Sequence, residues 1–139
     1  MAGFNDYAED EILDHVFGGG DYSRPATLYM AALKSAAADD DDGSTISEAD
    51  FTDYARVAIT NNATNFPAAS GGAKSNGTEI AFPEAGAGSN NDLTHWALLD
   101  SGTLGAGNII IAGAFDTTKN ITDGDTLRIP VGDLDITLD

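Results

Sequence analysis

Residues 93–100 read LTHWALLD, residues 108–115 read NIIIAGAF, and a short glycine-rich segment separates them. Two further runs follow, DTLRIPV at 125–131 and LDITL at 134–138, with Gly, Asn and Asp between the runs. Apolar or alternating runs of about five to eight residues bounded by turn residues are typical of β-strands, and several in succession indicate a sandwich or a barrel. We therefore predict a mainly β protein, built as an antiparallel β-sandwich or a barrel-like meander.

Upstream of this meander, three more segments have the pattern of strands. Residues 26–33, ATLYMAAL, follow Pro25 and fit either a buried strand or a short helix. Their β-branched and aromatic residues and the short length of the run favour a strand. Residues 54–60 and 78–82 alternate well enough to add two more strands. The predicted β-domain therefore covers residues 26–138.

Three long loops are predicted within this β-domain, at residues 34–53, 61–77 and 84–92. In the first loop, Ser47 is followed three residues later by Asp50, which predicts a capping box for a single turn of helix. The second loop is rich in Asn, Gly, Ser and Ala, which predicts a surface loop or arm.

One amphipathic helix is predicted near the N-terminus, over residues 4–17. Its apolar residues recur at spacings of three and four and form one stripe, while acidic residues occupy the other face. Asn5 is placed to cap the helix, and the glycines at 18–20 predict an abrupt end. We expect this helix to pack against one sheet.

The length of the chain, 139 residues, suits a single domain, so we expect residues 1–139 to form one unit. Cysteine is absent, which excludes disulfides, thiolate metal sites and a cysteine nucleophile. No apolar run approaches the roughly 18 residues that span a bilayer, and the first residues lack the features of a signal peptide. We therefore expect no membrane partner and no export by the usual route.

The charge balance is strongly acidic. The chain carries 23 Asp and Glu residues against 6 Lys and Arg residues, a formal net charge of −17. Self-repulsion at this charge weakens a compact fold unless salt screens it. The surface is therefore suited either to a saline medium or to a basic partner. Direct binding to nucleic acid is not expected, because too few cations are present to neutralise phosphates.

No motif in the sequence predicts catalysis or a cofactor. His15 and His95 have no predicted partners for catalysis or for metal binding. The run of acids in the first loop fails the ligand spacing of an EF-hand, so a solvated acidic loop is the preferred interpretation. Its members are the weak candidates for a cation site: Asp39, Asp40, Asp41 and Asp42. We expect no enzymatic activity, no resident metal and no cofactor.

The second loop contains a candidate contact surface. Phe66 is an apolar ring in a polar stretch, which suggests an anchor for a partner, with folding back onto the sheet as the alternative. Trp96, Tyr29 and Phe115 lie within apolar runs and are expected in the core, not in a sugar-binding platform. The neighbouring candidates for partner contact are Asn61, Asn62 and Asn65.

Segments spread over nearly the whole chain carry a family resemblance: Leu13–Gly18, Pro25–Leu33, Tyr54–Ile59, Ile80–Pro83, Thr94–Asp100, Gly113–Phe115, Gly124–Ile129 and Leu134–Asp139. In this order they resemble a family of small structural proteins of tailed double-stranded DNA viruses, described as tail-fibre-like or capsid decoration proteins. This chain is more acidic than the family pattern and inserts the aspartate run at 39–42, which points to a haloarchaeal or marine virus.

The resemblance implies a non-enzymatic virion protein that is assembled in the host cytoplasm. Our first expectation is a capsid decoration or cement protein, which stabilises the head by contacts with the major capsid protein. Such modules commonly form closed cyclic oligomers, and we expect a homo-oligomer, with a trimer favoured. A tail fibre, baseplate or tail-tip component in contact with tail proteins is the alternative. A carbohydrate-binding module or an enzyme is the third hypothesis.

Overall fold

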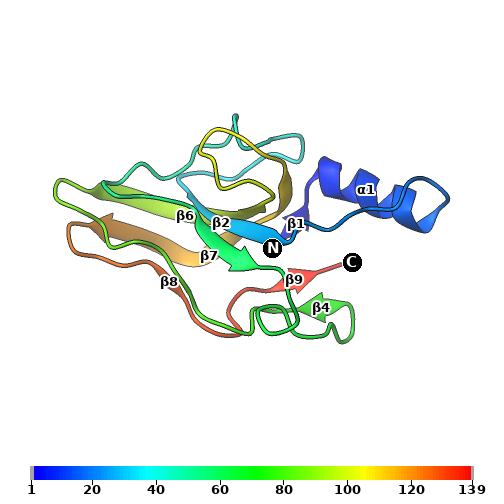
Figure 1. The fold of residues 1–139 in the computed structure, drawn as a ribbon. Coiled ribbons are helices and arrows are strands. Elements are labelled where there is room, and N and C mark those ends of the chain that lie inside the picture. The colour runs from blue at the N-terminus through cyan, green and yellow to red at the C-terminus, as the bar shows by residue number, and fades with distance from the viewer. Residues whose placement is uncertain (1, 139) are drawn as a thin grey trace.

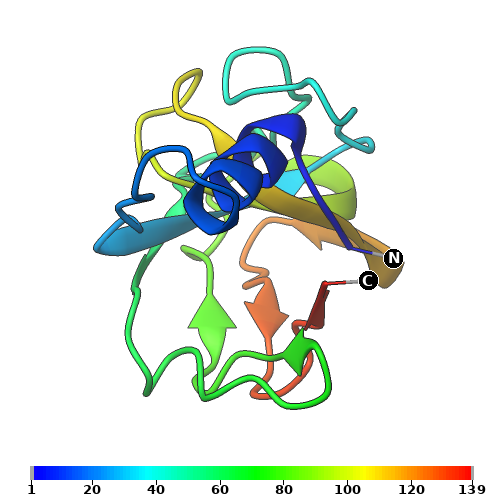
Figure 2. The same cartoon turned by 90° about the vertical axis from the view of Figure 1, so that its right-hand side faces the viewer.

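A five-stranded antiparallel sheet is the largest element of the computed structural model, which describes residues 2–138 (Figure 1). Two small two-stranded sheets lie on one side of it (Figure 2). The prediction of a mainly β protein with one helix is confirmed, and the sheets stay open instead of closing into a barrel. The large sheet has the order β1 (Gly3–Phe4), β7 (Ile109–Thr122), β6 (Asn90–Leu99), β2 (Thr27–Leu33) and β3 (Val57–Thr60). The small sheets pair β5 (Ile80–Ala81) with β8 (Arg128–Ile129), and β4 (Ala73–Lys74) with β9 (Ile136–Thr137).

The two longest strands, β6 and β7, form the central hairpin, and both are longer than predicted. β6 begins at Asn90, inside the predicted loop 84–92, and β7 continues to Thr122 through a polar stretch. The hydrogen bonds between β6 and β7 join backbone groups. Polar residues can therefore continue a strand wherever a partner strand is present. Asn120 Nδ2 also donates a hydrogen bond to Asp92 Oδ1 across this part of the hairpin (2.8 Å).

Apolar side chains alternate between two hydrophobic clusters, one on each face of the large sheet. In β6, Trp96 and Leu98 belong to the larger cluster, whereas Leu99 belongs to the smaller one. In β7, Ile109 and Ile111 belong to different clusters, although they are two residues apart. The register with β6 shifts between them, and a slip of one residue exchanges the faces of a strand. Both faces of the hairpin are thus buried.

The small sheets and the loops complete the larger cluster. The Tyr54 ring lies between two phenylalanines, edge-on to Phe51 with centroids 5.1 Å apart and stacked on Phe82 at 6.2 Å. Apolar residues from β5, β8 and the adjoining loops fill the rest of this layer: Phe66, Ile80, Leu127, Ile129 and Leu134. The layer covers the face of the sheet that carries Trp96.

Trp96 is in the core, as predicted, with 5% of its surface exposed. Gly113 lies opposite it in β7, and a Cβ atom there would lie 2.6 Å from Trp96 Cζ2. The close approach of the indole ring therefore requires glycine at this position. Phe115 packs against the same cluster, whereas Tyr29 is only half-buried.

Several of the predicted segments change, and the runs at 78–82, 125–131 and 134–138 shorten to β5, β8 and β9. The strand predicted at 54–60 is confined to β3, and the loop predicted at 61–77 contains β4. The helical turn predicted from the capping box at 47–50 is wrong. Instead this segment lies beside β2. The Ser47 carbonyl oxygen accepts a hydrogen bond from the Lys34 N–H (2.8 Å), and Glu48 forms an antiparallel β-bridge with Leu33. Pairing to a free strand edge outweighs a local capping signal.

The helix α1 spans Asp6–Val16, which is shorter than the predicted 4–17 because Phe4 belongs to β1. Asn5 occupies the N-cap position, but the prediction that its side chain caps the helix is wrong. Its Nδ2 atom donates instead to two carbonyl oxygens of the loop after β2, at 3.0 and 3.1 Å. Asn5 therefore ties the start of α1 to that loop.

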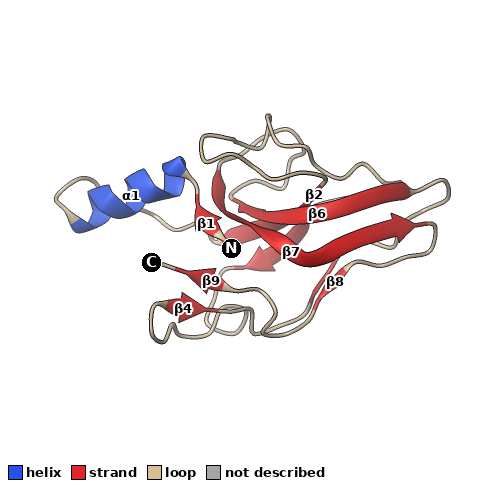
Figure 3. Cartoon of the chain, turned by 180° about the vertical axis from the view of Figure 1, so that it is seen from behind, coloured by secondary structure: helices blue, strands red, loops and turns tan. Residues whose placement is uncertain are grey.

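The helix ends at the glycines, as predicted. Gly18 has a φ of 90°, and the Gly19 N–H donates to the carbonyl oxygen of Asp14 (2.7 Å), which is the hydrogen bond of a glycine C-cap. Ala8 is the one buried residue of α1, and the rest of the helix extends beyond the end of the large sheet (Figure 3). The prediction that the helix packs against a sheet is therefore wrong beyond its first turns. Within residues 2–138, no helix is long and apolar enough to cross a membrane.

Candidate functional site

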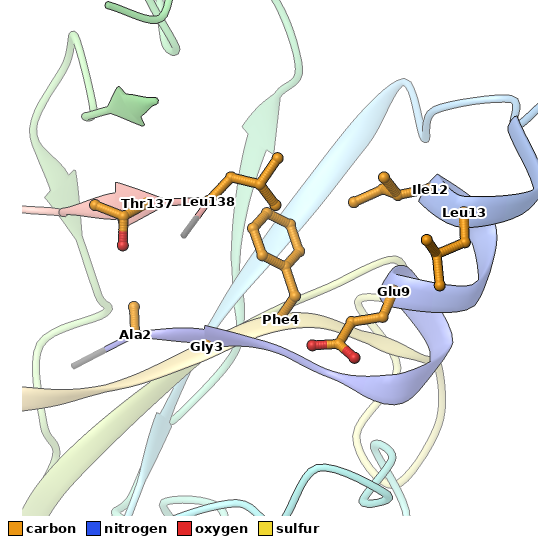
Figure 4. Close-up of a pocket in the computed structure, with 8 residues that line it drawn as sticks. All are labelled: Ala2, Gly3, Phe4, Glu9, Ile12, Leu13, Thr137 and Leu138. Atoms are coloured by element: carbon orange, nitrogen blue, oxygen red, sulfur yellow. The ribbon is translucent and has the colours of Figure 1, made fainter. Parts of the chain in front are cut away.

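An apolar groove lies between α1 and the end of β9 (Figure 4). Phe4 and Leu138 lie side by side on one wall, and Ile12 and Leu13 of α1 form the other. Glu9 is the one charged side chain among the described residues that line it. The groove has a volume of about 480 Å³, so it has room for several side chains of a partner.

The apolar surface of the groove continues along the outer part of α1. Leu13 is 54% exposed, Val16 60%, Phe17 79% and Leu138 61%. These four are among the six large hydrophobic residues that are exposed within residues 2–138, so most of that surface is at one end of the molecule. Leu13, Val16 and Phe17 share one helix face, because they are spaced by three and four residues. Large exposed apolar side chains gathered at one end of a molecule make that end a candidate interaction site.

The helix that forms one wall of the groove is strongly acidic. No Lys or Arg occurs within Asp6–Val16. Burial, followed by the charges of Glu11 and Asp100, raises the pKa of the Tyr7 hydroxyl. The acids of the helix are Asp6, Glu9, Asp10, Glu11 and Asp14. The groove therefore offers a partner both apolar contact and carboxylates.

We expect salt to stabilise the fold. The net charge of −17 is offset by few ion pairs between Lys or Arg and acids in residues 2–138. The Debye length falls from about 30 Å at 0.01 M salt to about 3 Å at 1 M salt, so added salt weakens the self-repulsion. The unfolding temperature, followed by far-UV circular dichroism, should rise from 0.01 M to 1 M NaCl. An equal unfolding temperature at both concentrations would show that the acidic surface does not limit stability.

A buried ion pair holds together the loop between β2 and β3 and the loop between β6 and β7. Arg56 Nε and Nη2 donate to the two carboxylate oxygens of Glu48, both at 2.8 Å. Arg56 Nη1 donates to the carbonyl oxygens of Ser101 and Ala106, again at 2.8 Å. The side chains of Arg56 and Glu48 are 0% and 11% exposed. This guanidinium joins the loop before β3 to the loop between β6 and β7.

Tyr54 extends the same hydrogen-bond network to β2. Its hydroxyl donates to Glu48 Oε1 (2.6 Å) and accepts from the Ala32 N–H (3.2 Å). Burial, together with the adjacent Glu48 carboxylate, raises the pKa of Tyr54 well above its usual range. The hydroxyl therefore stays protonated and serves as a donor. We assign this network a structural role, because every polar group named in it has a partner within the protein.

Asp50 has a similar anchoring role at the surface. Its Oδ2 accepts from Lys34 Nζ and its Oδ1 accepts from Asn91 Nδ2, both at 2.9 Å. The hydrogen bond from Lys34 and then the one from Asn91 lower the pKa of Asp50 below the ordinary value of 3.8. A lowered pKa in the folded state means that the carboxylate stabilises the fold above the ordinary pKa. That contribution is lost as the pH falls through the lowered value.

The variant Lys34→Met is expected to move the pKa of Asp50 upward toward its ordinary value, because the largest of its stabilising contacts is removed. A pH titration of the Asp50 side-chain carboxyl signal by NMR measures this shift. Asp42, whose pKa is lowered by Ser44 instead, is the internal control and should not move. An unchanged pKa of Asp50 would show that the ion pair does not form in solution.

The structure does not gather the four consecutive aspartates into a cation site. Asp41 Oδ2 accepts from the Ala38 N–H (2.7 Å), and Asp42 Oδ1 accepts from the N–H and hydroxyl of Ser44 (2.7 and 2.6 Å). Within residues 2–138, no three His, Asp or Glu side chains are grouped so that they could hold a metal ion. The carboxylates of Asp41 and Asp42 stabilise turns of their own loop.

The structure corrects the exposure of Phe66. Its ring is 6% exposed and belongs to the larger cluster, because the loop 61–77 folds back over the sheet. Asn61 and Asn65 donate to carbonyl oxygens at the ends of β2 and β3 (2.9 and 2.8 Å), and Asn62 Oδ1 accepts from two N–H groups of the same turn. Contact of these asparagines with a partner stays a prediction.

The two histidines lie on different elements and in local contacts. His15, in the last turn of α1, accepts a hydrogen bond from the Tyr22 N–H at Nδ1 (3.3 Å). His95, in β6, has its Nδ1 atom 2.8 Å from Thr94 Oγ1. The most developed candidate site is therefore the apolar groove, which the sequence did not predict because it placed the apolar stripe of α1 against a sheet.

Comparison with known proteins identifies one family. The family model described as "Podophage GP4 fiber I protein gp80" matches residues 3–137. The match includes the large sheet, both small sheets and α1, and therefore nearly all of the groove. A search of curated proteins gave no match.

Proposed function

The chain belongs to the podophage GP4 fiber I protein gp80 family, a family of structural fibre proteins of tailed phages, and we propose that it is a non-enzymatic component of a viral tail fibre. The observation that carries this proposal is the extent of the match, residues 3–137 of 139. The proposal therefore rests on family membership over nearly the whole chain and not on one short motif.

The structure supports a mechanical role in two ways. The buried Arg56–Glu48 pair and the two-sided core hold the loops firmly on the large sheet. The projecting helix α1 and the apolar groove offer a place for attachment at one end. A stable body with an attachment site at one end is suited to a component that transmits force between parts of a particle.

Our first expectation was capsid decoration. We now favour the fibre role, because the matching family model is named after a fibre protein. Three further features belong to the proposal: contact with other tail proteins, association as a trimer, and a virus of a saline environment. The last rests on the net charge of −17. A carbohydrate-binding or enzymatic role is favoured by no contact in the structure described above.

Quantitative mass spectrometry of purified virions, separated into heads and tails, tests the proposal. We expect this protein in the tail fraction, at a few to tens of copies for each particle. Hundreds of copies in the head fraction would overturn the tail-fibre role and restore capsid decoration. Absence from both fractions would overturn the virion role altogether.

A further inference from the structure

We propose that the apolar groove between α1 and β9 is the docking site for a segment of another virion protein that combines bulky apolar side chains with lysines. This inference rests on the proposed function, because it names the kind of partner that anchors the fibre component.

The apolar side chains at the groove are exposed to solvent. Phe17, at 79% exposure, and Val16, at 60%, extend the apolar surface of the groove along α1. Leu138, at 61%, continues it on the opposite wall, next to Phe4 (Figure 4). Burying such side chains stabilises a complex, before the costs of association are counted. An occupant must therefore supply apolar side chains.

The charged side chains at the groove and on its helix wall are acidic. Glu9 lines the groove, and the exposed carboxylates of Asp10 and Asp14 lie on the same helix. An apolar segment that also carried acids would be repelled at this surface, whereas lysines would pair with these carboxylates. The occupant that complements the groove is therefore cationic as well as apolar.

Charge disfavours a second copy of this chain as the occupant of the groove, so the trimer proposed above would use another surface. Each copy brings a net charge of −17 and six Lys and Arg residues. Half of those cations are held by acids of their own chain, in the ion pairs Lys34–Asp50, Arg56–Glu48 and Arg128–Glu79. A second copy would thus add far more negative than positive charge at the groove. Charge complementarity favours a different protein.

Zero-length crosslinking of purified virions with a carbodiimide tests this proposal, because the reagent joins a carboxylate to a lysine that touches it. We expect crosslinks from Glu9, Asp10 or Asp14 to lysines of another virion protein, within a segment that contains large apolar residues. Crosslinks from these acids to lysines of a second copy would overturn the proposal. Their absence, with crosslinks from other acids present, would overturn it as well.

Matched variants provide the second readout. The double variant Leu13→Glu with Phe17→Glu should reduce the copies of this protein in virions at least tenfold. The control Leu104→Glu with Val131→Glu adds the same charge at residues that are 54% and 61% exposed outside the groove, and should be incorporated normally. Equal incorporation of both variants would contradict docking at the groove.

The outcomes distinguish this inference from the proposed function. If the unaltered protein is absent from the tail fraction, the proposed function fails and the docking site fails with it. If the protein is present on tails and the groove variants are incorporated normally, only the docking site fails. Circular dichroism of each purified variant shows whether a loss of incorporation arises from unfolding.

Discussion

Replacing Arg56 by methionine should lower the free energy of unfolding by about 3–5 kcal/mol, because the variant leaves the Glu48 carboxylate at 11% exposure without its counter-ion. The change also removes the donor to the carbonyl oxygens of Ser101 and Ala106. Buried acceptors without a donor cost further free energy. Urea unfolding at a fixed salt concentration, followed by far-UV circular dichroism, measures the loss.

Arg128→Met is the matched control for this prediction. Arg128 also donates to a carboxylate, Glu79 Oε1, at 2.6 Å, but the two side chains are 55% and 47% exposed. Solvent and salt screen such a pair, so its loss should cost no more than about 1 kcal/mol. If the two arginine variants lose equal stability, the Arg56–Glu48 pair is not buried as the structure has it.

Phe66→Ala should destabilise the protein by about 3–5 kcal/mol, the range observed when a buried phenylalanine is truncated. The prediction follows from the 6% exposure of Phe66 and its place in the larger cluster. The lost transfer free energy and the cavity left beside the sheet both contribute. Thermal and urea unfolding measure the effect.

Phe17→Ala is the control for the phenylalanine prediction, because Phe17 is 79% exposed. Removing its ring should change stability by less than about 0.5 kcal/mol. The same variant should weaken incorporation into virions, because Phe17 extends the apolar groove. A stability loss at Phe17 equal to that at Phe66 would show that the helix end packs against the body in solution.

Helices and strands could be predicted from the sequence where the residues of a single element carry the pattern by themselves. The short apolar runs in residues 93–100 and 26–33 predicted β6 and β2, because the residue types and the length of each run mark a single strand. The glycine at 18 predicted the end of α1 through a backbone conformation that favours glycine. The extension of β7 into polar residues was missed, since only the partner strand stabilises it.

The candidate site could not be predicted, because its parts are distant in the sequence. Phe4 and Leu138 lie at opposite ends of the chain, and no local pattern shows that they meet. The apolar stripe of α1 was recognised, but the same stripe is expected whether a sheet or another protein covers it. Phe66 was misjudged for the related reason that its polar neighbours conceal its contact with a remote cluster.

The buried ion pair could not be predicted either, because its contacts also join distant parts of the sequence. Glu48 lies in the predicted loop 34–53, and Arg56 lies eight residues later in the strand predicted at 54–60. Charged residues are seldom fully buried, so neither position predicted a buried pair. Their burial depends on the carbonyl groups of a loop between two other strands. A sequence pattern reports the periodicity of one element. This network instead joins three separate parts of the chain: β2, the loop before β3, and the loop between β6 and β7.

Immunogold electron microscopy of intact virions, with an antibody raised against the purified protein, is the most direct test of the tail-fibre role. We expect gold particles at the fibres of the tail, and none over the head. Gold distributed over the head would contradict the tail-fibre role, and unlabelled virions with an antibody that recognises the folded protein would contradict a surface position on the virion.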